Sequence, residues 1–352
     1  MKPLLFVLGT RPEGLKLLPL VWECQKRSIP YEILHTDQHA ELLDALLTEH
    51  RIEPDYRLFL FGRNTQLCER KAQILAQMAQ VLAHRKFSAL LVQGDTLSAL
   101  VGAEYGFLCE IPVVHIEAGM RTYCPEHPYP EEAFRRTIGA MASLHFCPSE
   151  DEKHHLLREG VRERQIFVTG NTFPDYWNAL PKRTAEPKKQ ILITIHRREN
   201  LPFLNHVFAE IAEIAASLPD THFLFPLHPN PAIVECAEQR LESIPNLSLC
   251  APMPPDEFYR ELLSSETVIT DSGGVQEECI FHAKKVLVLR KVSERRTDFD
   301  FCTLVDPAEH TLKEEFHTLL QKKITATHCD YYGRGGAAAR IVDALEQAYG
   351  EK

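Results

Sequence analysis

The sequence has no pair of cysteines with the C-x-x-C spacing that is typical of structural zinc sites. Its ten cysteines are scattered along the chain. Several lie inside apolar runs, such as Cys147 in LHFCP and Cys250 in LSLCAP, and these are typical of small buried hydrophobic residues. Scattered free thiols suit a reducing compartment. We therefore predict no metal site.

Long hydrophobic runs are absent as well. The first apolar run has only five residues before Gly9, which is too short for the core of a signal peptide. No stretch approaches the ~20 apolar residues of a membrane-spanning helix. The sequence therefore predicts a cytoplasmic protein without a membrane partner.

Positive charge is scarce relative to negative charge. The chain has 39 Lys and Arg against 49 Asp and Glu, a net charge of −10. A chain this acidic is a poor general binder of phosphate backbones, so we predict no nucleic-acid partner. A few local Arg and Lys side chains could still hold a small anionic ligand.

The first predicted turn also lacks the glycine pattern of dinucleotide-binding proteins. The segment Gly9-Thr10-Arg11-Pro12 does not have the G-x-G-x-x-G spacing that lets a pyrophosphate approach the backbone. A nicotinamide cofactor is therefore not expected, and we predict no cofactor.

The sequence does contain short apolar runs that alternate with helical patterns. Runs without polar alternation, separated by helices, predict parallel strands covered on both faces. At ~150 residues per domain, 352 residues suggest about two domains. The predicted strands are 4–9, 31–36, 89–95, 112–119, 144–149 and 166–171, followed by 191–196, 222–228, 247–252, 267–272 and 285–290.

A polar, Pro- and Lys-rich stretch separates the two sets of strands and predicts a linker. The fold class is thus α/β, with two Rossmann-like, doubly wound parallel-sheet domains and an active site expected in the cleft between them. The predicted parts are residues 1–177, the linker 178–190, residues 191–333, and a C-terminal helix in 334–352 that packs back on the first domain.

Ligands of doubly wound sheets bind at the carboxyl ends of strands, so polar residues after each apolar run are candidates for the site. Arg11 and Lys16 follow the first strand beside a helix start with a Thr10-x-x-Glu13 capping box. They are either phosphate ligands or surface cations of a capped helix. Asp95 ends another strand and is either a functional carboxylate or the N-cap of the next helix.

Glu117 ends a third strand, where a carboxylate is costly unless it is paired or used. Because Glu is a poor N-cap, its structural interpretation is weaker. Glu131 and Arg135 stand four residues apart at the start of a helix. Taken alone, this spacing favours a surface ion pair over a functional pair.

The second half carries the sharpest motif, Asp271-Ser272-Gly273-Gly274 followed by a helix. Backbone N–H groups at such a helix start can cradle a phosphate, and Glu278 could accept both hydroxyls of a ribose. The alternative is a glycine turn before an ordinary helix. His196, followed by two arginines at the end of another strand, suits a diphosphate.

Together these motifs resemble the non-hydrolysing UDP-N-acetylglucosamine 2-epimerase family, which has a two-domain architecture like that of GT-B glycosyltransferases. The similarity spans almost the whole chain in the right order. The matching segments are 9–13 with Lys16, Gln38-His39, 94–96, 115–122, 130–135, 168–172, 196–199, 271–278, and 332–335 through Arg340-Ile341.

The resemblance implies roles for matching residues. Ser272, Gly273, Gly274 and Glu278 would bind UDP, with Arg11, Lys16, Arg135, Arg295 and His196 supporting the UDP-sugar or the departure of UDP. Asp95, Glu117 and Glu131 would be the carboxylates that handle the C2 proton, and His196 is counted with them as catalytic. The family reaction eliminates UDP to a 2-acetamidoglucal and adds it back after the proton returns on the other face, in polysaccharide biosynthesis. A homodimer is also expected.

Some family motifs are altered. Thr36-Asp37-Gln38-His39 departs from T-G-Q-H, Ala283-Lys284-Lys285 from G-K-P, and 293–297 from T-E-R-P-E, although Arg295 is kept. Gln38 and His39 match an allosteric UDP-N-acetylglucosamine site of bacterial members, but the Gln-rich stretch of that site is offset here at 63–67, so activation is not assumed. Alternatives are epimerisation or hydrolytic epimerisation of another UDP-2-acetamido sugar, a glycosyltransferase, or a non-catalytic UDP-sugar sensor.

Overall fold

The computed structural model describes residues 2–62, 65–180, 185–326 and 328–350. The chain divides into two compact units, Met1–Pro181 with Tyr331–Lys352 (unit 1) and Lys182–Asp330 (unit 2). Unit 2 begins nine residues before the predicted start at 191 and ends three residues before the predicted end at 333. The predicted linker also overlaps the last residues of α7 (Phe173–Ala179) and the first of β8 (Gln190–Thr194), and its residues 181–184 lie outside the described part of the chain.

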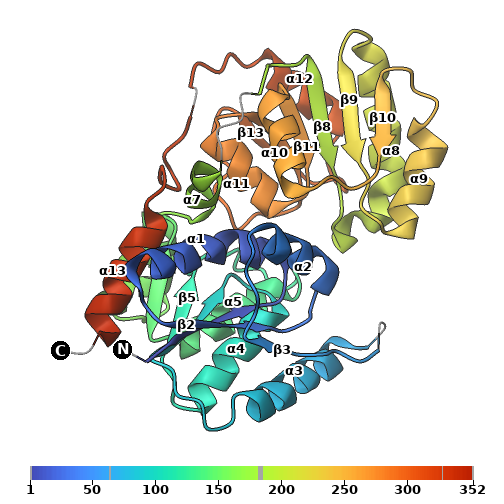
Figure 1. The fold of residues 1–352 in the computed structure, drawn as a ribbon. Helices are drawn as coiled ribbons and strands as arrows, with labels where there is room; N and C mark the ends of the chain where they lie inside the picture. The colour runs from blue at the N-terminus through green and yellow to red at the C-terminus, as the bar shows by residue number, and fades with distance from the viewer. Residues whose placement is uncertain (1, 63–64, 181–184, 327, 351–352) are drawn as a thin grey trace. The chain divides into compact units, whose positions relative to one another are not determined.

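Unit 1 is built on a parallel sheet covered by helices on both faces (Figure 1). Its strands, in spatial order, are β3 (Tyr56–Arg57), β2 (Tyr31–His35), β1 (Leu4–Leu8), β4 (Ala89–Gln93), β5 (Val113–Ile116), β6 (Leu144–Cys147) and β7 (Ile166–Val168). Its helices are α1 (Arg11–Arg27), α2 (Ala40–Glu49), α3 (Leu67–Val81), α4 (Leu97–Leu108), α5 (Glu131–Met141), α6 (Glu150–Arg158), α7 and α13 (Ala337–Tyr349).

The central strand β1 shows why this sheet is buried on both sides. All five of its residues are fully buried. Leu4, Phe6 and Leu8 enter one apolar core, whereas Leu5 and Val7 enter the other, because successive side chains of a strand point to opposite faces. A run of apolar residues without alternation is therefore the expected sequence of such a strand.

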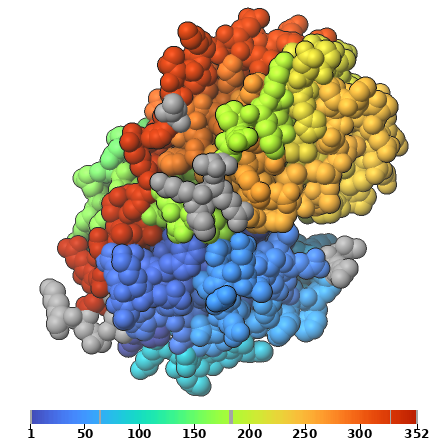
Figure 2. All heavy atoms as spheres, turned by 45° about the horizontal axis from the view of Figure 1, so that its top comes forward, coloured from blue at the N-terminus to red at the C-terminus, as the bar shows by residue number. Residues whose placement is uncertain are grey.

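The C-terminal helix α13 belongs to unit 1. Its buried residues Ile341, Val342 and Leu345 join the same core as Leu17 and Val21 of α1. Figures 1 and 2 show α13, in red, lying against α1, in blue. Burying each of these side chains stabilises the packing by roughly 1.5–3 kcal/mol.

Unit 2 repeats the arrangement with a second parallel sheet. Its strands, in spatial order, are β10 (Leu247–Cys250), β9 (His222–Pro226), β8, β11 (Thr267–Thr270), β12 (Lys285–Leu289) and β13 (Cys302–Val305). Its helices are α8 (Leu204–Ser217), α9 (Pro231–Leu241), α10 (Pro255–Ser264), α11 (Gly273–Phe281) and α12 (Leu312–Gln321).

Each sheet has one place where neighbouring strands lead to helices on opposite sides. In unit 1 it lies between β1 and β4, and in unit 2 between β8 and β11. The register pairs Phe6 with Leu91 and Thr194 with Thr270, so the carboxyl ends of the two strands meet in each case. Ligands of open α/β sheets bind in such crevices.

The eleven predicted strands are all present, and each ends one to three residues earlier than expected. The predicted ranges included the polar residues that begin the following turns. β3 and β13 were missed because Tyr56–Arg57 has no apolar run and Cys302–Val305 contains a threonine and a cysteine. Among the described helices, none combines the length and the apolar character needed to cross a membrane.

Candidate active site

Two of the three predicted carboxylates of unit 1, Asp95 and Glu117, follow β4 and β5, and both are bound to a cation. Glu117 comes directly after β5, is almost fully buried, and forms an ion pair with the Lys16 ammonium. Gln93 Nε2 donates to the same carboxylate oxygen at 2.6 Å. Glu117 also has φ of +61°, a left-handed conformation that is uncommon outside glycine. The local fold thus holds this carboxylate in a strained turn, as active sites often do.

Asp95 follows β4 and is hydrogen-bonded to the Arg135 guanidinium of α5. Its side chain keeps 31% of its surface exposed, whereas the Arg135 side chain is 3% exposed. The interpretation of Asp95 as an N-cap is wrong: Thr96 caps α4, accepting from the Ala99 N–H at 3.0 Å. Asp95 is therefore a partly exposed carboxylate held in an ion pair.

Arg135 is not the surface cation that its spacing from Glu131 favoured. It is buried and bonds to Asp95 and, at 3.3 Å, to Glu132. Glu132 is itself buried and accepts the backbone N–H groups of Thr122 and Tyr123 at 3.0 Å each. Glu131 is the first residue of α5, beside this network.

Glu13 is a site residue that the sequence analysis treated only as part of a capping box. It is fully buried and accepts from Gly9 N at 3.0 Å, Thr10 Oγ1 at 2.8 Å and Thr96 Oγ1 at 2.6 Å. Glu13 therefore connects the loop after β1 with the loop after β4. Burial raises the pKa of Glu13 to about 7, against the lowering effect of these hydrogen bonds.

The capping box itself forms at the start of α1. Thr10 is the N-cap and accepts the Glu13 N–H at 3.4 Å, with Pro12 in the first turn. Arg11 is the first residue of the helix, so the chain places a cation beside its N-terminus. Gln38 accepts from Ser98 N at 3.0 Å and Ser98 Oγ at 2.6 Å, and the His39 N–H donates to Gly9 O at 2.8 Å. Both residues therefore lie at the same crevice.

Two buried histidines lie behind the Asp95 loop. His115 Nε2 lies 2.8 Å from the Gly94 carbonyl, so this nitrogen is the donor. His145 is its neighbour in register on β6. Burial lowers the pKa of His115 to about 3 and that of His145 to about 4. Both rings are thus neutral near pH 7, and His115 holds the turn before Asp95.

In unit 2 the Ser-Gly-Gly motif forms the turn that was predicted. Ser272 is the N-cap of α11, and its hydroxyl accepts the Val275 N–H at 3.5 Å. A Cβ added at Gly273 would lie 2.2 Å from Arg295 Nη1, whereas one at Gly274 would meet nothing closer than 4.0 Å. A side chain at 273 would therefore have to displace the Arg295 guanidinium. Glu278 lies in the same helix and is partly exposed.

Arg295 is held by carboxylates of unit 2. Its Nε lies 3.0 Å from Glu277 Oε1, and it also pairs with Glu294. Glu294 bonds in turn to the buried Arg290 at 2.8 Å. These contacts fix the guanidinium against the first turn of α11, where it adds positive charge to the helix start.

Asp271 organises the loop that carries His196. This carboxylate is fully buried and accepts from the N–H groups of His196 at 3.1 Å and Arg197 at 2.9 Å, and from Asn200 Nδ2 at 3.0 Å. His196 Nδ1 lies 3.2 Å from Asp271 Oδ1, so this carboxylate orients the imidazole ring. The sequence does point to Asp271, because it is a carboxylate at the end of a buried strand, like Asp95 and Glu117.

The two crevices thus differ in chemistry. Unit 1 gathers carboxylates bound to Lys16 and Arg135, a set that can exchange protons. Unit 2 presents a helix start and a buried Asp271 paired with the partly exposed His196, a set that can hold an anionic leaving group. A protein with these two sets is of the class that transforms a nucleotide-linked substrate.

Comparison with known proteins agrees with this class. The family model described as UDP-N-acetylglucosamine 2-epimerase matches residues 23–346. A UDP-N-acetylglucosamine 2-epimerase of Yersinia pestis is 36% identical over 373 residues, covering 97% of this chain and 98% of that protein. The chain belongs to the UDP-N-acetylglucosamine 2-epimerase family.

Solved structures show the same relationship. The UDP-GlcNAc 2-epimerase of Neisseria meningitidis, crystallised with UDP-GlcNAc bound, is 35% identical with a TM-score of 0.91, covering 99% of this chain and all of that one. The fold alone is shared with the glycosyltransferase of kitacinnamycin, at 16% identity and a TM-score of 0.61. The two α/β domains and their likeness to glycosyltransferases are therefore confirmed.

Proposed function

We propose that this protein is a non-hydrolysing epimerase that interconverts UDP-N-acetylglucosamine and UDP-N-acetylmannosamine at C2. The observation that carries the proposal is the set of carboxylates in unit 1. Asp95, bonded to Arg135, and Glu117, bonded to Lys16, follow neighbouring parallel strands. Membership of the family and the UDP-GlcNAc found in the Neisseria meningitidis structure support the choice of substrate.

The proposed reaction has two half-steps. A carboxylate of the set Asp95, Glu117 and Glu131 removes the C2 proton, the bond between C1 and the UDP oxygen breaks, and a C1–C2 double bond forms. Return of a proton to the opposite face of C2 and addition of UDP to C1 then give the epimer. No oxidant or reductant is consumed, so the atoms and electrons balance.

Each group has a chemical reason for its role. Removing a weakly acidic C–H requires a base that is held close and kept dry, and Glu117 is nearly fully buried. Expelling UDP requires stabilisation of the developing diphosphate charge. Ser272, Gly273, Gly274 and His196 are proposed for the diphosphate, with Arg11 in support, and Glu278 is proposed for the ribose.

Glu13 and Asp271 are proposed as positioning residues. Glu13 connects the Arg11 and Asp95 loops through Thr10 and Thr96. Asp271 orients the His196 ring and its backbone. Neither is proposed to touch the sugar.

A second candidate is the same chemistry on another UDP-2-acetamido sugar, or with hydrolytic release of the free epimer. The altered loop at 293–297 favours this second candidate, because Arg295 in that loop is held by Glu277 and Glu294. The test is to incubate pure protein with a panel of UDP-sugars and follow products by NMR. We expect UDP-N-acetylmannosamine from UDP-N-acetylglucosamine. Free N-acetylmannosamine as the main product would contradict the non-hydrolysing assignment, and turnover of a different sugar alone would contradict the substrate. The cytoplasmic location and the homodimer stay predictions.

A further inference from the structure

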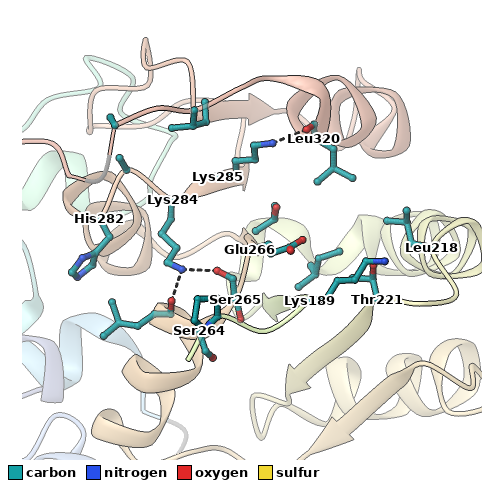
Figure 3. A pocket seen from close by; sticks show the side chains of 17 residues that line it. Lys189, Leu218, Thr221, Ser264, Ser265, Glu266, His282, Lys284, Lys285 and Leu320 are labelled. Carbon is teal, nitrogen blue, oxygen red and sulfur yellow. Dashed lines mark hydrogen bonds between the residues drawn. The ribbon is translucent and has the colours of Figure 1, made fainter. Parts of the chain in front are cut away.

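Unit 2 contains a cavity that the proposed reaction does not use. Its volume is about 660 Å³, and it opens at the amino-terminal edge of the sheet, beside Ile191 of β8, Thr267 of β11 and Lys285 of β12 (Figure 3). The loops proposed for the nucleotide follow Thr194 and Thr270, at the opposite ends of β8 and β11. The cavity is therefore distinct from the proposed nucleotide site.

Three lysines line this cavity: Lys189, Lys284 and Lys285. In the part of the chain that the structure describes, none of the three forms an ion pair with a carboxylate. Glu266 is the one acidic residue of the lining, so the lining has an excess of positive charge. Lysines without a carboxylate partner at a cavity favour an anionic occupant.

The hydrogen bonds of two of these lysines do not account for all their donors. Lys284 Nζ donates to the carbonyls of Leu263 and Ser265, at the end of α10, and Lys285 Nζ donates to Leu320 O at 2.6 Å, at the end of α12. Lysines often cap helix ends in this way. An ammonium has three N–H groups, so one remains on Lys284 and two on Lys285. Burial lowers the pKa of both lysines, and an adjacent anion would offset that cost.

An apolar wall completes the lining. Ile191, Leu218 and Leu320 supply apolar surface on the same cavity.

We propose that this cavity binds a small organic acid, with its carboxylate at Lys284 and Lys285 and an apolar body against Leu218 and Leu320. A cavity of about 660 Å³ lies in the size range of small-molecule sites. Lys285 stands where the family motif G-K-P has proline. The proposal does not rest on the proposed epimerase activity.

The test uses the full chain and hexanoate, with hexylammonium as the probe of opposite charge and equal tail. Isothermal titration should give saturable binding of hexanoate, unchanged by excess UDP, and no binding of hexylammonium. Absence of hexanoate binding would overturn the proposal. Equal binding of both probes, or loss of hexanoate binding in excess UDP, would overturn it as well. Binding of inorganic phosphate without hexanoate would show a plain anion site and reject the organic acid.

Variants locate the binding. Lys285→Met keeps the apolar stem and should weaken hexanoate binding by about tenfold or more, as expected for loss of a charged hydrogen bond. Lys188→Met is the matched control, because Lys188 does not line the cavity and bonds to Glu261 at 2.8 Å. It should leave the dissociation constant unchanged. If circular dichroism shows that Lys285→Met is unfolded, Lys284→Met replaces it. Hexanoate affinity that is insensitive to the folded lining variant would contradict the assignment.

Discussion

Unit 1 and unit 2 share the strand order around their crevices but fill these crevices differently. The β1–β4 crevice holds buried carboxylates such as Glu13 and Glu117, which are bound by hydroxyls, an amide and Lys16. At the β8–β11 crevice, the buried Asp271 accepts mainly backbone N–H groups. The same topology can therefore supply either acid–base groups or an anion cradle, depending on the few residues that follow each strand.

The largest expected effect comes from substitutions of carboxylates in unit 1 that leave unit 2 unchanged. Asp95→Asn and Glu117→Gln keep the side-chain shape but remove a base, so turnover should fall by ~10²-fold or more while UDP affinity stays within a few-fold. A coupled epimerase assay and isothermal titration measure the two. Glu163→Gln, which removes a surface carboxylate paired with Lys153, is the control and should be fully active. Full activity in both site variants would discard the carboxylate assignment.

Glu13 tests whether its burial is costly when it is ionised. Its pKa is about 7 in the fold against an ordinary value of 4.5, so the folded state binds more protons between these pH values. The contribution of Glu13 to stability is thus fully present below pH 4.5 and is lost as the pH rises through 7, by on the order of 3 kcal/mol. Glu13→Gln does not titrate, so the stability of wild type relative to the variant should fall over this range.

Denaturant titrations at pH 4.5, 6 and 7.5 measure the difference in the free energy of unfolding between wild type and Glu13→Gln. Glu163→Gln should show no such pH-dependent difference, because Glu163 is exposed and its paired pKa is lowered rather than raised. A difference for Glu13→Gln that stays constant with pH would show that Glu13 is ionised throughout this range.

Glu278 tests the nucleotide-binding role proposed for unit 2. Glu278→Ala should weaken UDP binding by ~1.5–3 kcal/mol, the range for hydrogen bonds to a charged group. Glu238→Ala, on helix α9, is an exposed control that should bind UDP normally. An unchanged dissociation constant in Glu278→Ala would move the ribose site elsewhere.

Substitutions at the adjacent Gly273 and Gly274 should affect stability and UDP binding differently. Gly273→Ala would place Cβ against Arg295, so it should lower the melting temperature of the free protein. Gly274→Ala meets no close neighbour and should raise stability by up to ~1 kcal/mol, since alanine is the better helix former. Gly274→Ala should nevertheless weaken UDP binding if the diphosphate approaches this backbone. Thermal melts without UDP measure the change in stability, and the rise in melting temperature on adding UDP measures binding. UDP-induced rises that are equal in the two variants would contradict the proposed diphosphate site at this helix start.

Eleven of the strands followed from the sequence because apolar runs of this kind are fully buried in parallel sheets, whereas their order in each sheet comes from the structure. The residues after each strand were also predictable, since Asp95, Glu117 and Ser272 stand where the chain leaves the sheet. The partners were not predictable, because Asp95 pairs with Arg135 across 40 residues and Lys16 with Glu117 across 101. The burial of Glu13 was not predictable for the same reason, because its third hydrogen-bond donor, Thr96, comes from a distant loop.

In the proposed mechanism C2 is epimerised by proton removal coupled to loss of UDP, and the hydrogen at C2 reports on this step directly. The reaction should be run in heavy water from UDP-N-acetylglucosamine, without added nicotinamide, and the product examined by NMR and mass spectrometry. We expect one solvent deuterium at C2 of the product, with traces of free UDP and a glycal when the intermediate escapes. A product that retains its original C2 hydrogen would contradict the elimination mechanism.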